Sequence, residues 1–255
     1  MENYTELEEK NSLIAQGKAT VEPTLSKEDG AKALIYNFFG DITAQDDSIV
    51  EAYDAEQERL QKEKNEIAKQ THFEHSGVGS KYWGLRLSDF DAYTDNLKKN
   101  LEVVQDTIQA IKENKPRTLW MCGANGNGKS MLSAMIAREC WGMYTRMYNI
   151  EDALKDADNF HNSKNRTETF ESYANVKVLI IDEVGRNPDD KIELKNLFHI
   201  LNDRYENEKS TILVTNLSKK GLAEYLGKAL TDRFVESCVS LEFTEASYRK
   251  KERVI

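Results

Sequence analysis

Apolar residues recur with a helical period in the stretch before residue 115. Leu97, Leu101, Val104, Ile108 and Ile111 are separated by three or four positions, which puts them on one face of an α-helix. This spacing predicts a helix over 95–114. Similar patterns predict further helices over 130–141 and 192–205.

Short apolar runs alternate with these helical patterns. They predict five strands, over 117–122, 146–150, 176–181, 211–215 and 239–243. Because a helical pattern separates each of the first four strands from the next, neighbouring strands need crossover connections. The alternation therefore predicts an α/β fold in which helices cover both faces of a five-stranded, mostly parallel sheet.

The first 75 residues follow a different pattern. Residues 1–25 show no clear period, a short helix is predicted from Ser26 until Gly40, and a longer helix with a thin apolar stripe is predicted over 46–70. The sequence THFEHSGVGS, with Gly77 and Gly79, then indicates a hinge. We predict a small helical segment with its linker over 1–75 and a larger domain over 76–255.

Two histidines, His72 and His75, lie at this hinge and are half of what a metal site needs. No Cys or further His follows at ligand spacing, and structural zinc sites need four such ligands. We interpret the pair as linker residues exposed to solvent.

The net charge of −9 is concentrated in the leading segment. Residues 1–75 contain 8 Lys and Arg against 17 Asp and Glu, so residues 76–255 are neutral. The phosphates of nucleic acid repel an acidic segment, which favours a protein partner; the alternative is that the charge only keeps the chain soluble.

The composition also bears on the compartment. No apolar run approaches the ~18 residues of a membrane-spanning helix, and the acidic opening MENYTELEEK differs from a signal peptide. The three cysteines contain no CxxC pair, which is typical of a reducing compartment. We expect a cytoplasmic protein without a membrane partner.

A phosphate-binding motif follows the first predicted strand. The residues GANGNGKS match GxxxxGK[ST] at every fixed position, and a helical pattern begins at once. Glycines let successive N–H groups point at a polyphosphate, and the helix N-terminus adds a positive dipole. Lys129 is expected to reach the β- and γ-phosphates of ATP, and Ser130 to bind Mg²⁺. The full predicted ATP site is Gly123, Asn125, Gly126, Asn127, Gly128, Lys129, Ser130 and Met131. The alternative is a glycine-rich turn that binds nothing.

An acidic pair ends the third predicted strand. The run VLII is followed directly by Asp182 and Glu183, and open α/β sheets bind ligands at the carboxyl ends of their strands. We predict that Asp182 binds Mg²⁺ and that Glu183 polarises the attacking water in hydrolysis. The alternative is an acidic pair exposed in a loop.

Two further polar residues, Asn216 and Arg233, lie near the ends of predicted elements. Asn216 follows the strand predicted over 211–215 and either orients the attacking water or is an ordinary turn residue. Arg233 lies on a short predicted helix before the last strand and, taken alone, forms at most a surface salt bridge.

The order of these motifs resembles the AAA+ ATPases, and within them the DnaC/DnaI/IstB group of bacterial and phage helicase loaders and transposition helpers. The resemblance covers roughly residues 76–250. It rests on LSDFDAY, GANGNGKS, VLIIDEVG, LFHILNDRYENEKSTILVTN, LGKALTDRF and the SYR that follows the last strand. It implies a P-loop AAA+ core in which Asn216 is sensor I and Arg233 is an arginine finger that completes the ATP site of a neighbouring subunit.

Two positions depart from the larger AAA+ pattern. Few residues follow residue 243, so the C-terminal helical lid that carries sensor II is expected to be missing, as in the loader group. Ala229 stands where many relatives have a second basic residue.

The resemblance also implies partners. Residues 1–75 lack the cysteine-rich zinc pattern of the DnaI type and look like the helical DnaC type, which implies binding to a DnaB-type replicative DNA helicase. The polar stretch 152–173 occupies the place of an extra helix that contacts single-stranded DNA in loaders, with Lys155, Lys164, Arg166, Phe170 and Tyr173 as candidates. Nearby acidic residues make a solvated crossover an equal alternative.

The resulting expectation is an ATP-dependent helicase loader that associates with itself. The nearest rival is an IstB-like transposition helper on duplex DNA, which requires phosphate neutralisation that an acidic segment opposes. A small-molecule kinase would leave Arg233 without a role. A nucleotide-dependent adaptor with negligible turnover would not need Glu183.

Overall fold

The computed structural model describes residues 47–158, 165–187, 189–234 and 238–248. The short helix predicted after Ser26 lies outside these residues. The chain divides into two compact units between Lys64 and Asn65. Helix α3 (Asp47–His75) crosses this division, and its last turns belong to the second unit, where the Phe73 side chain is fully buried. The helix thus extends further than the predicted 46–70.

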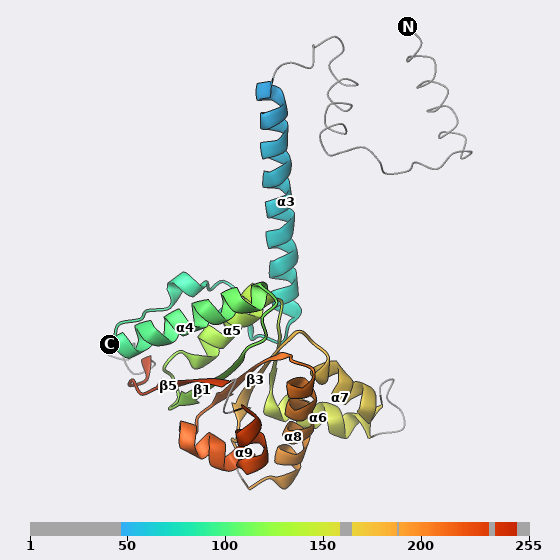
Figure 1. Cartoon of the computed structure of the whole chain (residues 1–255), viewed down its shortest axis with the longest axis vertical. Coiled ribbons are helices and arrows are strands. Elements are labelled where there is room, and N and C mark those ends of the chain that lie inside the picture. The colour runs from blue at the N-terminus through green and yellow to red at the C-terminus, as the bar shows by residue number, and fades with distance from the viewer. Residues whose placement is uncertain (1–46, 159–164, 188, 235–237, 249–255) are drawn as a thin grey trace, which may run out of the picture. The chain divides into compact units, whose positions relative to one another are not determined.

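The second unit is an α/β domain in which at least one helix connects each described strand to the next (Figure 1). Two short 3-10 turns, Ser80–Tyr82 and Leu87–Asp89, lie near the start of this unit, after α3. Its elements are α4 (Asp95–Lys112), β1 (Thr118–Gly123), α5 (Lys129–Cys140), β2 (Met143–Arg146), α6 (Met147–Ala157), α7 (Arg166–Ala174), β3 (Val178–Val184), α8 (Lys191–Glu206), β4 (Ser210–Thr215), α9 (Lys219–Phe234) and β5 (Cys238–Phe243).

All strand pairings are parallel, in the order β2-β3-β4-β1-β5. The predicted five-stranded parallel sheet is therefore confirmed. The described chain continues from β5 to Tyr248 without another α-helix. Among the helices that the structure describes, none is long and apolar enough to cross a membrane.

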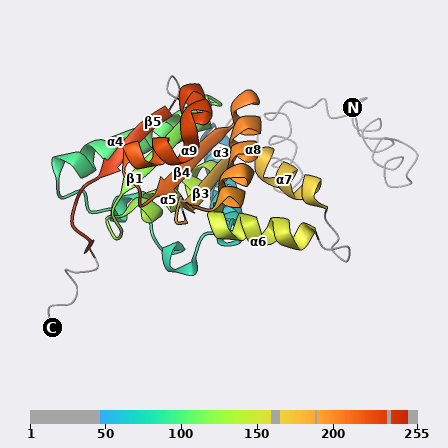
Figure 2. The same ribbon diagram turned by 90° about the horizontal axis from the view of Figure 1, so that it is seen from below.

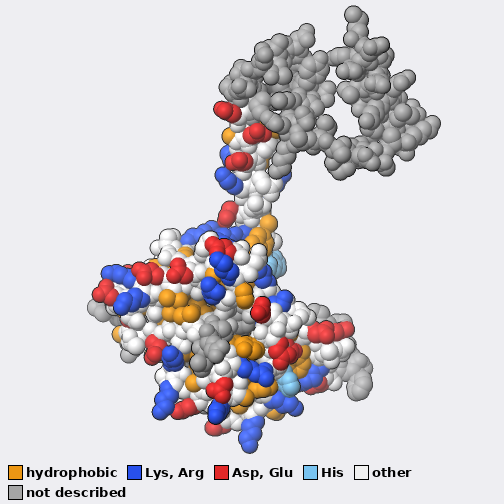
Figure 3. Space-filling view, in the orientation of Figure 1, with side chains coloured by type: hydrophobic (Ala, Val, Ile, Leu, Met, Phe, Trp, Pro, Cys, Tyr) orange, Lys and Arg blue, Asp and Glu red, His pale blue; other side chains and the backbone are white. Residues whose placement is uncertain are grey.

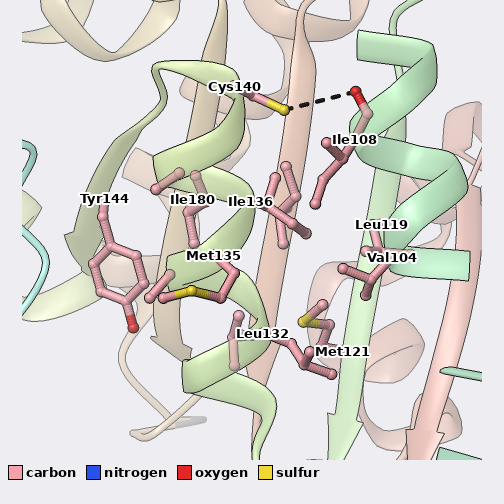
Figure 4. Packing of buried hydrophobic residues seen from close by; sticks show 14 of the residues in the cluster. Val104, Ile108, Leu119, Met121, Leu132, Met135, Ile136, Cys140, Tyr144 and Ile180 are labelled. Atoms are coloured by element: carbon pink, nitrogen blue, oxygen red, sulfur yellow. Dashed lines mark hydrogen bonds between the residues drawn. The ribbon is translucent and has the colours of Figure 1, made fainter. Parts of the chain in front are cut away.

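Alternate residues of the central strands pack on opposite faces of the sheet, as the period of a strand requires. Leu119 and Met121 join the cluster formed with α4 and α5, shown in Figure 4. Trp120 and Cys122 join the second cluster, to which α6, α8 and α9 contribute. Helices α6 and α7 pack against each other on this side (Figure 2). The two clusters make a three-layered domain with the sheet in the middle.

The strand predicted over 146–150 is wrong. Strand β2 is Met143–Arg146, and α6 begins at the next residue. Met147, Ile150 and Leu154 are buried at helical spacing, so this stretch packs one helical face on the core. The structure confirms the predicted helix before β1, which is α4, with the expected apolar residues facing the core.

The stretch predicted as a hinge is packed against the sheet. The backbone N–H of Tyr144 in β2 donates a hydrogen bond to the carbonyl of Ser76 at 2.7 Å. His72 and His75 lie in the last turn of α3, and the His72 ring packs on Trp141 with centroids 5.3 Å apart. The functional division into 1–75 and 76–255 stays a prediction.

Candidate nucleotide-binding site

The predicted motifs meet at one edge of the sheet. Strands β1, β4 and β3 are adjacent and parallel, so their carboxyl ends lie at the same edge. The loop after β1, Asn216 after β4 and the acidic pair on β3 all line one cavity of about 840 Å³. Of the predicted site residues, the lining includes Asn125, Gly126, Asn127, Gly128, Lys129, Ser130, Met131, Asp182, Glu183 and Asn216.

The loop between β1 and α5 has the backbone that a phosphate cradle needs. Gly126 and Gly128 adopt left-handed conformations, with φ of 84° and 96°. A Cβ atom on Gly126 would lie 2.0 Å from the Ser247 hydroxyl oxygen, so only glycine fits there. Helix α5 starts directly afterwards at Lys129, and the N–H groups of its first turn lack intrahelical acceptors. The loop and helix therefore fit the polyphosphate of a nucleotide.

Lys129 is folded onto this loop. Its Nζ atom donates to the carbonyl oxygens of Gly123 and Ala124 at 2.6 and 2.5 Å, and to Oδ1 of Asn127 at 3.0 Å. The residue is 5% exposed, and burial lowers the pKa of Lys129 to about 8, with the Asp182 charge opposing the shift. Among the described residues no carboxylate forms an ion pair with this buried ammonium, which makes it well suited to an anionic ligand.

Asn127 anchors the loop to the last strand. Its side chain is fully buried, and its Nδ2 atom donates to the carbonyl of Phe243 at 2.8 Å. The loop is also tied to the chain beyond β5, because the N–H of Tyr248 donates to the Gly126 carbonyl at 2.8 Å. The Tyr248 hydroxyl in turn donates to the carbonyl of Asp91. The segments before α4 and after β5 thus close around the loop.

Asp182 is positioned by two donors. The Tyr144 hydroxyl donates to its Oδ2 atom, and the N–H of Glu183 donates to Oδ1 at 2.8 Å. Burial, followed by the Asp182 charge, raises the pKa of Tyr144, so the phenol stays a neutral donor. Asp182 and Ser130 line the same cavity, and such oxygen ligands fit Mg²⁺.

Glu183 lies in an irregular part of β3. The pairing with β4 advances three residues from Ile181 to Val184 but only two from Leu213 to Thr215, which is a β-bulge. Glu183 has a φ of 61°, a conformation that costs free energy for any residue except glycine and often marks functional sites. Its Oε2 atom accepts a hydrogen bond from Arg186 at 3.0 Å.

Sequence reasoning did not find several residues of this cavity. Tyr144, Arg146 and Arg186 line it, as does Lys81 from the first 3-10 turn. Register explains one of these: Arg146 in β2 pairs with Asp182 in β3. No local pattern distinguished Tyr144, because strand pairing alone brings it to the acidic strand.

Arg233 lies elsewhere in the domain. It is in the last turn of α9, its Nη1 atom is 3.8 Å from Oε1 of Glu206, and it is not among the described residues that line the cavity. The structure therefore does not bring Arg233 to the nucleotide site of its own chain. Its role at a neighbouring site stays a prediction.

The candidate DNA-contacting residues are partly engaged within the protein. Phe170 and Tyr173 pack against the second core cluster. Arg166 donates to Asp158 at 2.7 Å and to Asn196 at 3.1 Å. Lys155 is exposed, whereas Lys164 lies outside the described residues. Figure 3 shows that basic and acidic side chains are interspersed on the visible face of the second unit, the α/β domain.

Known proteins resemble this chain over most of its length. Residues 47–255 match the family described as IstB-like ATP binding protein. The chain is 26% identical over 211 residues to the replicative helicase loader DnaC of Buchnera aphidicola subsp. Baizongia pistaciae, covering 78% of this chain and 85% of that protein. It is 28% identical over 160 residues to the insertion sequence IS232 putative ATP-binding protein of Bacillus thuringiensis subsp. berliner, covering 60% and 64%.

Solved structures share the fold. A crystal structure of the DnaC helicase loader matches with a TM-score of 0.58 at 19% identity, over 65% of this chain and all of that one. DnaI matches with a TM-score of 0.53 at 20% identity, over 66% and 93%. Replication initiator DnaA bound to AMPPCP and single-stranded DNA matches with 0.55 at 20% identity, over 66% and 51%. Together with the family match, the phosphate loop and the acidic strand, these likenesses show that the chain belongs to the IstB-like ATP-binding family, in the DnaC/DnaI/IstB group of AAA+ ATPases.

Proposed function

We propose that this chain is a Mg²⁺-dependent ATPase that loads a replicative DNA helicase. The observation that carries the proposal is the arrangement of charge around the cavity. Lys129, Asp182, Glu183 and Asn216 line it together, while Arg233 lies outside it. This division suits an ATPase whose site is completed by a second subunit.

Each residue of the cavity has a role in this proposal. The N–H groups of the loop and Lys129 hold the phosphates, and Ser130 and Asp182 hold Mg²⁺. Bound Mg-ATP would supply the γ-phosphoryl group: the oxygen of water bonds to the γ-phosphorus, the bond to the β–γ bridging oxygen breaks, and ADP and phosphate leave. When the Glu183 carboxylate is released from Arg186, it accepts a hydrogen bond from that water. Asn216 orients the same water. Such positioning and charge stabilisation account for most of the catalysis in phosphoryl transfer.

We also propose that this chain associates with copies of itself. An arginine that reaches a neighbour's γ-phosphate stabilises the transition state only when subunits meet. Arg233 has one ion-pair partner among the described residues, Glu206, at the long distance of 3.8 Å. Moving from this pair to a phosphate would replace a weak surface interaction with a stronger one.

The leading segment is proposed to bind the helicase. Residues 1–75 carry the net charge of −9, and the acidic side chains of α3 between Glu51 and Lys64 are exposed. Single-stranded DNA is the other proposed partner, near α6. The exposed Lys155 would contact its backbone there, whereas Phe170 and Tyr173 pack inward.

A transposition helper is the second candidate. It is supported by the likeness to the IS232 ATP-binding protein and by the family itself. A protein that coats duplex DNA has to neutralise many phosphates, and the charge of residues 1–75 opposes this. The two candidates differ in their first macromolecular partner, which makes them separable by experiment.

Native mass spectrometry of the full chain with the replicative helicase of its host tests the proposal. We expect a stable complex, and we expect Glu51→Lys with Glu58→Lys and Glu63→Lys to abolish it while nucleotide binding persists. The matched control is Glu102→Lys with Asp106→Lys on the exposed surface of α4, which should leave the complex intact. ATP-dependent binding to duplex DNA without any helicase complex would select the transposition helper.

A further inference from the structure

The turn that follows the acidic pair has an unusual backbone. Glu183 and Gly185 both have left-handed conformations, with φ of 61° and 68°. A Cβ atom on Gly185 would lie 2.7 Å from Cδ1 of Leu217, so a larger residue here would displace the Leu217 side chain as well as adopt a strained backbone. A non-glycine residue in this conformation persists only when its surroundings hold it there. The groups that hold this turn therefore also keep the backbone of Glu183 in its left-handed conformation.

The peptide unit between Val184 and Gly185 is held from both sides. The Thr215 hydroxyl donates to the carbonyl of Val184 at 2.6 Å. The N–H of Gly185 donates to Oε1 of Glu193 at 3.0 Å. Because the carbonyl and the N–H belong to one planar group, these two hydrogen bonds together fix its orientation, one residue after Glu183.

Glu193 is itself fixed by a second donor. The Tyr225 hydroxyl donates to the same Oε1 atom at 2.6 Å. Glu193 is 3% exposed and Tyr225 is 9% exposed, so both hydrogen bonds are shielded from water and strengthened by the low dielectric. At the start of α8, Asp190 caps the N–H groups of Ile192 and Glu193.

These hydrogen bonds connect the turn after Glu183 to β4, α8 and α9. Thr215 is the last residue of β4, directly before Asn216. Tyr225 lies on α9, in the part of the helix before Gly227, whose non-helical backbone (φ of 76°) separates it from the part that carries Arg233. Thr215, Glu193 and Tyr225 are not among the described residues that line the nucleotide cavity. Any effect that they have on the reaction must therefore pass through the residues that they hold.

We infer that Thr215, Glu193 and Tyr225 form a positioning clamp that orients Glu183 toward the attacking water and couples it to the strand that ends before Asn216. The inference rests on the proposed ATPase function. Its components touch no substrate, and they act by fixing the peptide between Val184 and Gly185. Loss of one hydroxyl from the clamp should lower turnover and leave nucleotide binding unchanged.

Two single-atom or isosteric substitutions test the clamp. Tyr225→Phe and Thr215→Val each remove one hydroxyl, and Tyr173→Phe on α7 is the matched control, since Tyr173 packs against the same core cluster outside the clamp. We expect kcat to fall roughly 10-fold to 100-fold in the two clamp variants, as small displacements of a catalytic group do. The dissociation constant for ATP should match wild type in all three. Unchanged kcat in both clamp variants would overturn the inference.

A double-mutant comparison shows whether the effect passes through Glu183. In the Glu183→Gln background, Tyr225→Phe should cause no further loss in single-turnover rate, because the group that it positions is already disabled. The same fold loss in both backgrounds would show that Tyr225 acts by another route and would overturn the clamp.

Hydrogen exchange separates failure of this inference from failure of the proposed function. The Gly185 amide should exchange faster in Tyr225→Phe and Thr215→Val than in wild type and in Tyr173→Phe, measured without nucleotide. If wild type neither bound nor hydrolysed ATP, the proposed function would fall, and faster exchange would still support the clamp. If exchange at Gly185 were the same in every variant, the clamp would fall with the ATPase intact.

Discussion

The hydroxyl of Tyr144 donates a hydrogen bond to Oδ2 of Asp182, the carboxylate that we expect to bind Mg²⁺. Tyr144→Phe removes that donor and leaves the N–H of Glu183 as the donor to this carboxylate among the described residues. Loss of such a supporting partner typically weakens a metal site by about 10-fold to 100-fold. The Mg²⁺ concentration at half-maximal turnover should rise in this range, while ATP binding in EDTA stays as in wild type. An unchanged Mg²⁺ titration would show that Tyr144 only packs the core.

Lys129→Ala should abolish or strongly weaken ATP binding, because it removes the point charge next to the phosphates. The fold should persist, since the acceptors of Lys129 include the carbonyl groups of the half-buried Gly123 and the exposed Ala124, where water can replace the ammonium. Calorimetric titration with ATP measures the effect, and circular dichroism checks the fold. Wild-type affinity in a folded variant would remove the phosphate-site assignment.

ATP binding should take up a proton at alkaline pH. Burial lowers the pKa of Lys129 to about 8 from 10.5, so the free protein carries a neutral lysine above that pH, and phosphates restore the charge. Affinity should therefore fall as the pH rises above about 8. The same shift makes the folded state bind fewer protons than the unfolded state between about pH 8 and 10.5, so the free-energy cost of burying a charged Lys129 decreases as the pH rises through this range. Calorimetry in buffers of different ionisation heat should detect the proton at about pH 9 and not at about pH 7. Equal heats at both values would contradict the prediction.

Arg233 should act on a neighbouring subunit. Arg233→Ala and Glu183→Gln should each be inactive alone, since an arginine finger can contribute ~10³-fold or more in rate. When the two variants are mixed, some interfaces bring an intact Glu183 together with an intact Arg233, so turnover should partly return. Single-stranded DNA and helicase are added to promote assembly. If both variants fold and associate but no mixture regains activity, Arg233 acts within its own chain or only supports the fold.

Arg204 should be essential for stability, because it holds the junction of α7, β3 and β4. Its side chain is fully buried and donates to the carbonyls of Tyr173, Ala174, Val176 and Ser210 and to the Thr211 hydroxyl. Arg204→Met leaves these acceptors unsatisfied and should lower the free energy of unfolding by about 3 kcal/mol or more. Urea denaturation measures the change. The exposed Arg117→Met is the control and should change it little; equal effects would contradict the prediction.

The phosphate loop and the acidic strand were predictable because their signals are local. A glycine-rich turn between a strand and a helix can be identified from consecutive residues, here Gly123 to Ser130. Likewise, the continuous apolar run that ends in Asp182 and Glu183 indicates a buried strand without any information from distant residues. The parallel sheet followed from the alternation of elements. The segment after β2 misled the prediction because Arg146 ends a four-residue strand and Met147 begins a helix at once, so the run 146–150 joined the end of a strand to the first turn of a helix.

Tertiary packing decided how the site is supported. Tyr144 reaches Asp182 because β2 pairs with β3, and Glu193 meets Tyr225 because α8 packs on α9. These partners are separated by many residues of ordinary composition, so no spacing rule connects them. The sequence alone indicated which groups are candidates for binding phosphate and Mg²⁺, since each of the two motifs that carry them is a short contiguous run. The tertiary structure determined their orientation, because a buried hydrogen bond between distant residues exists only after the elements that carry them have packed.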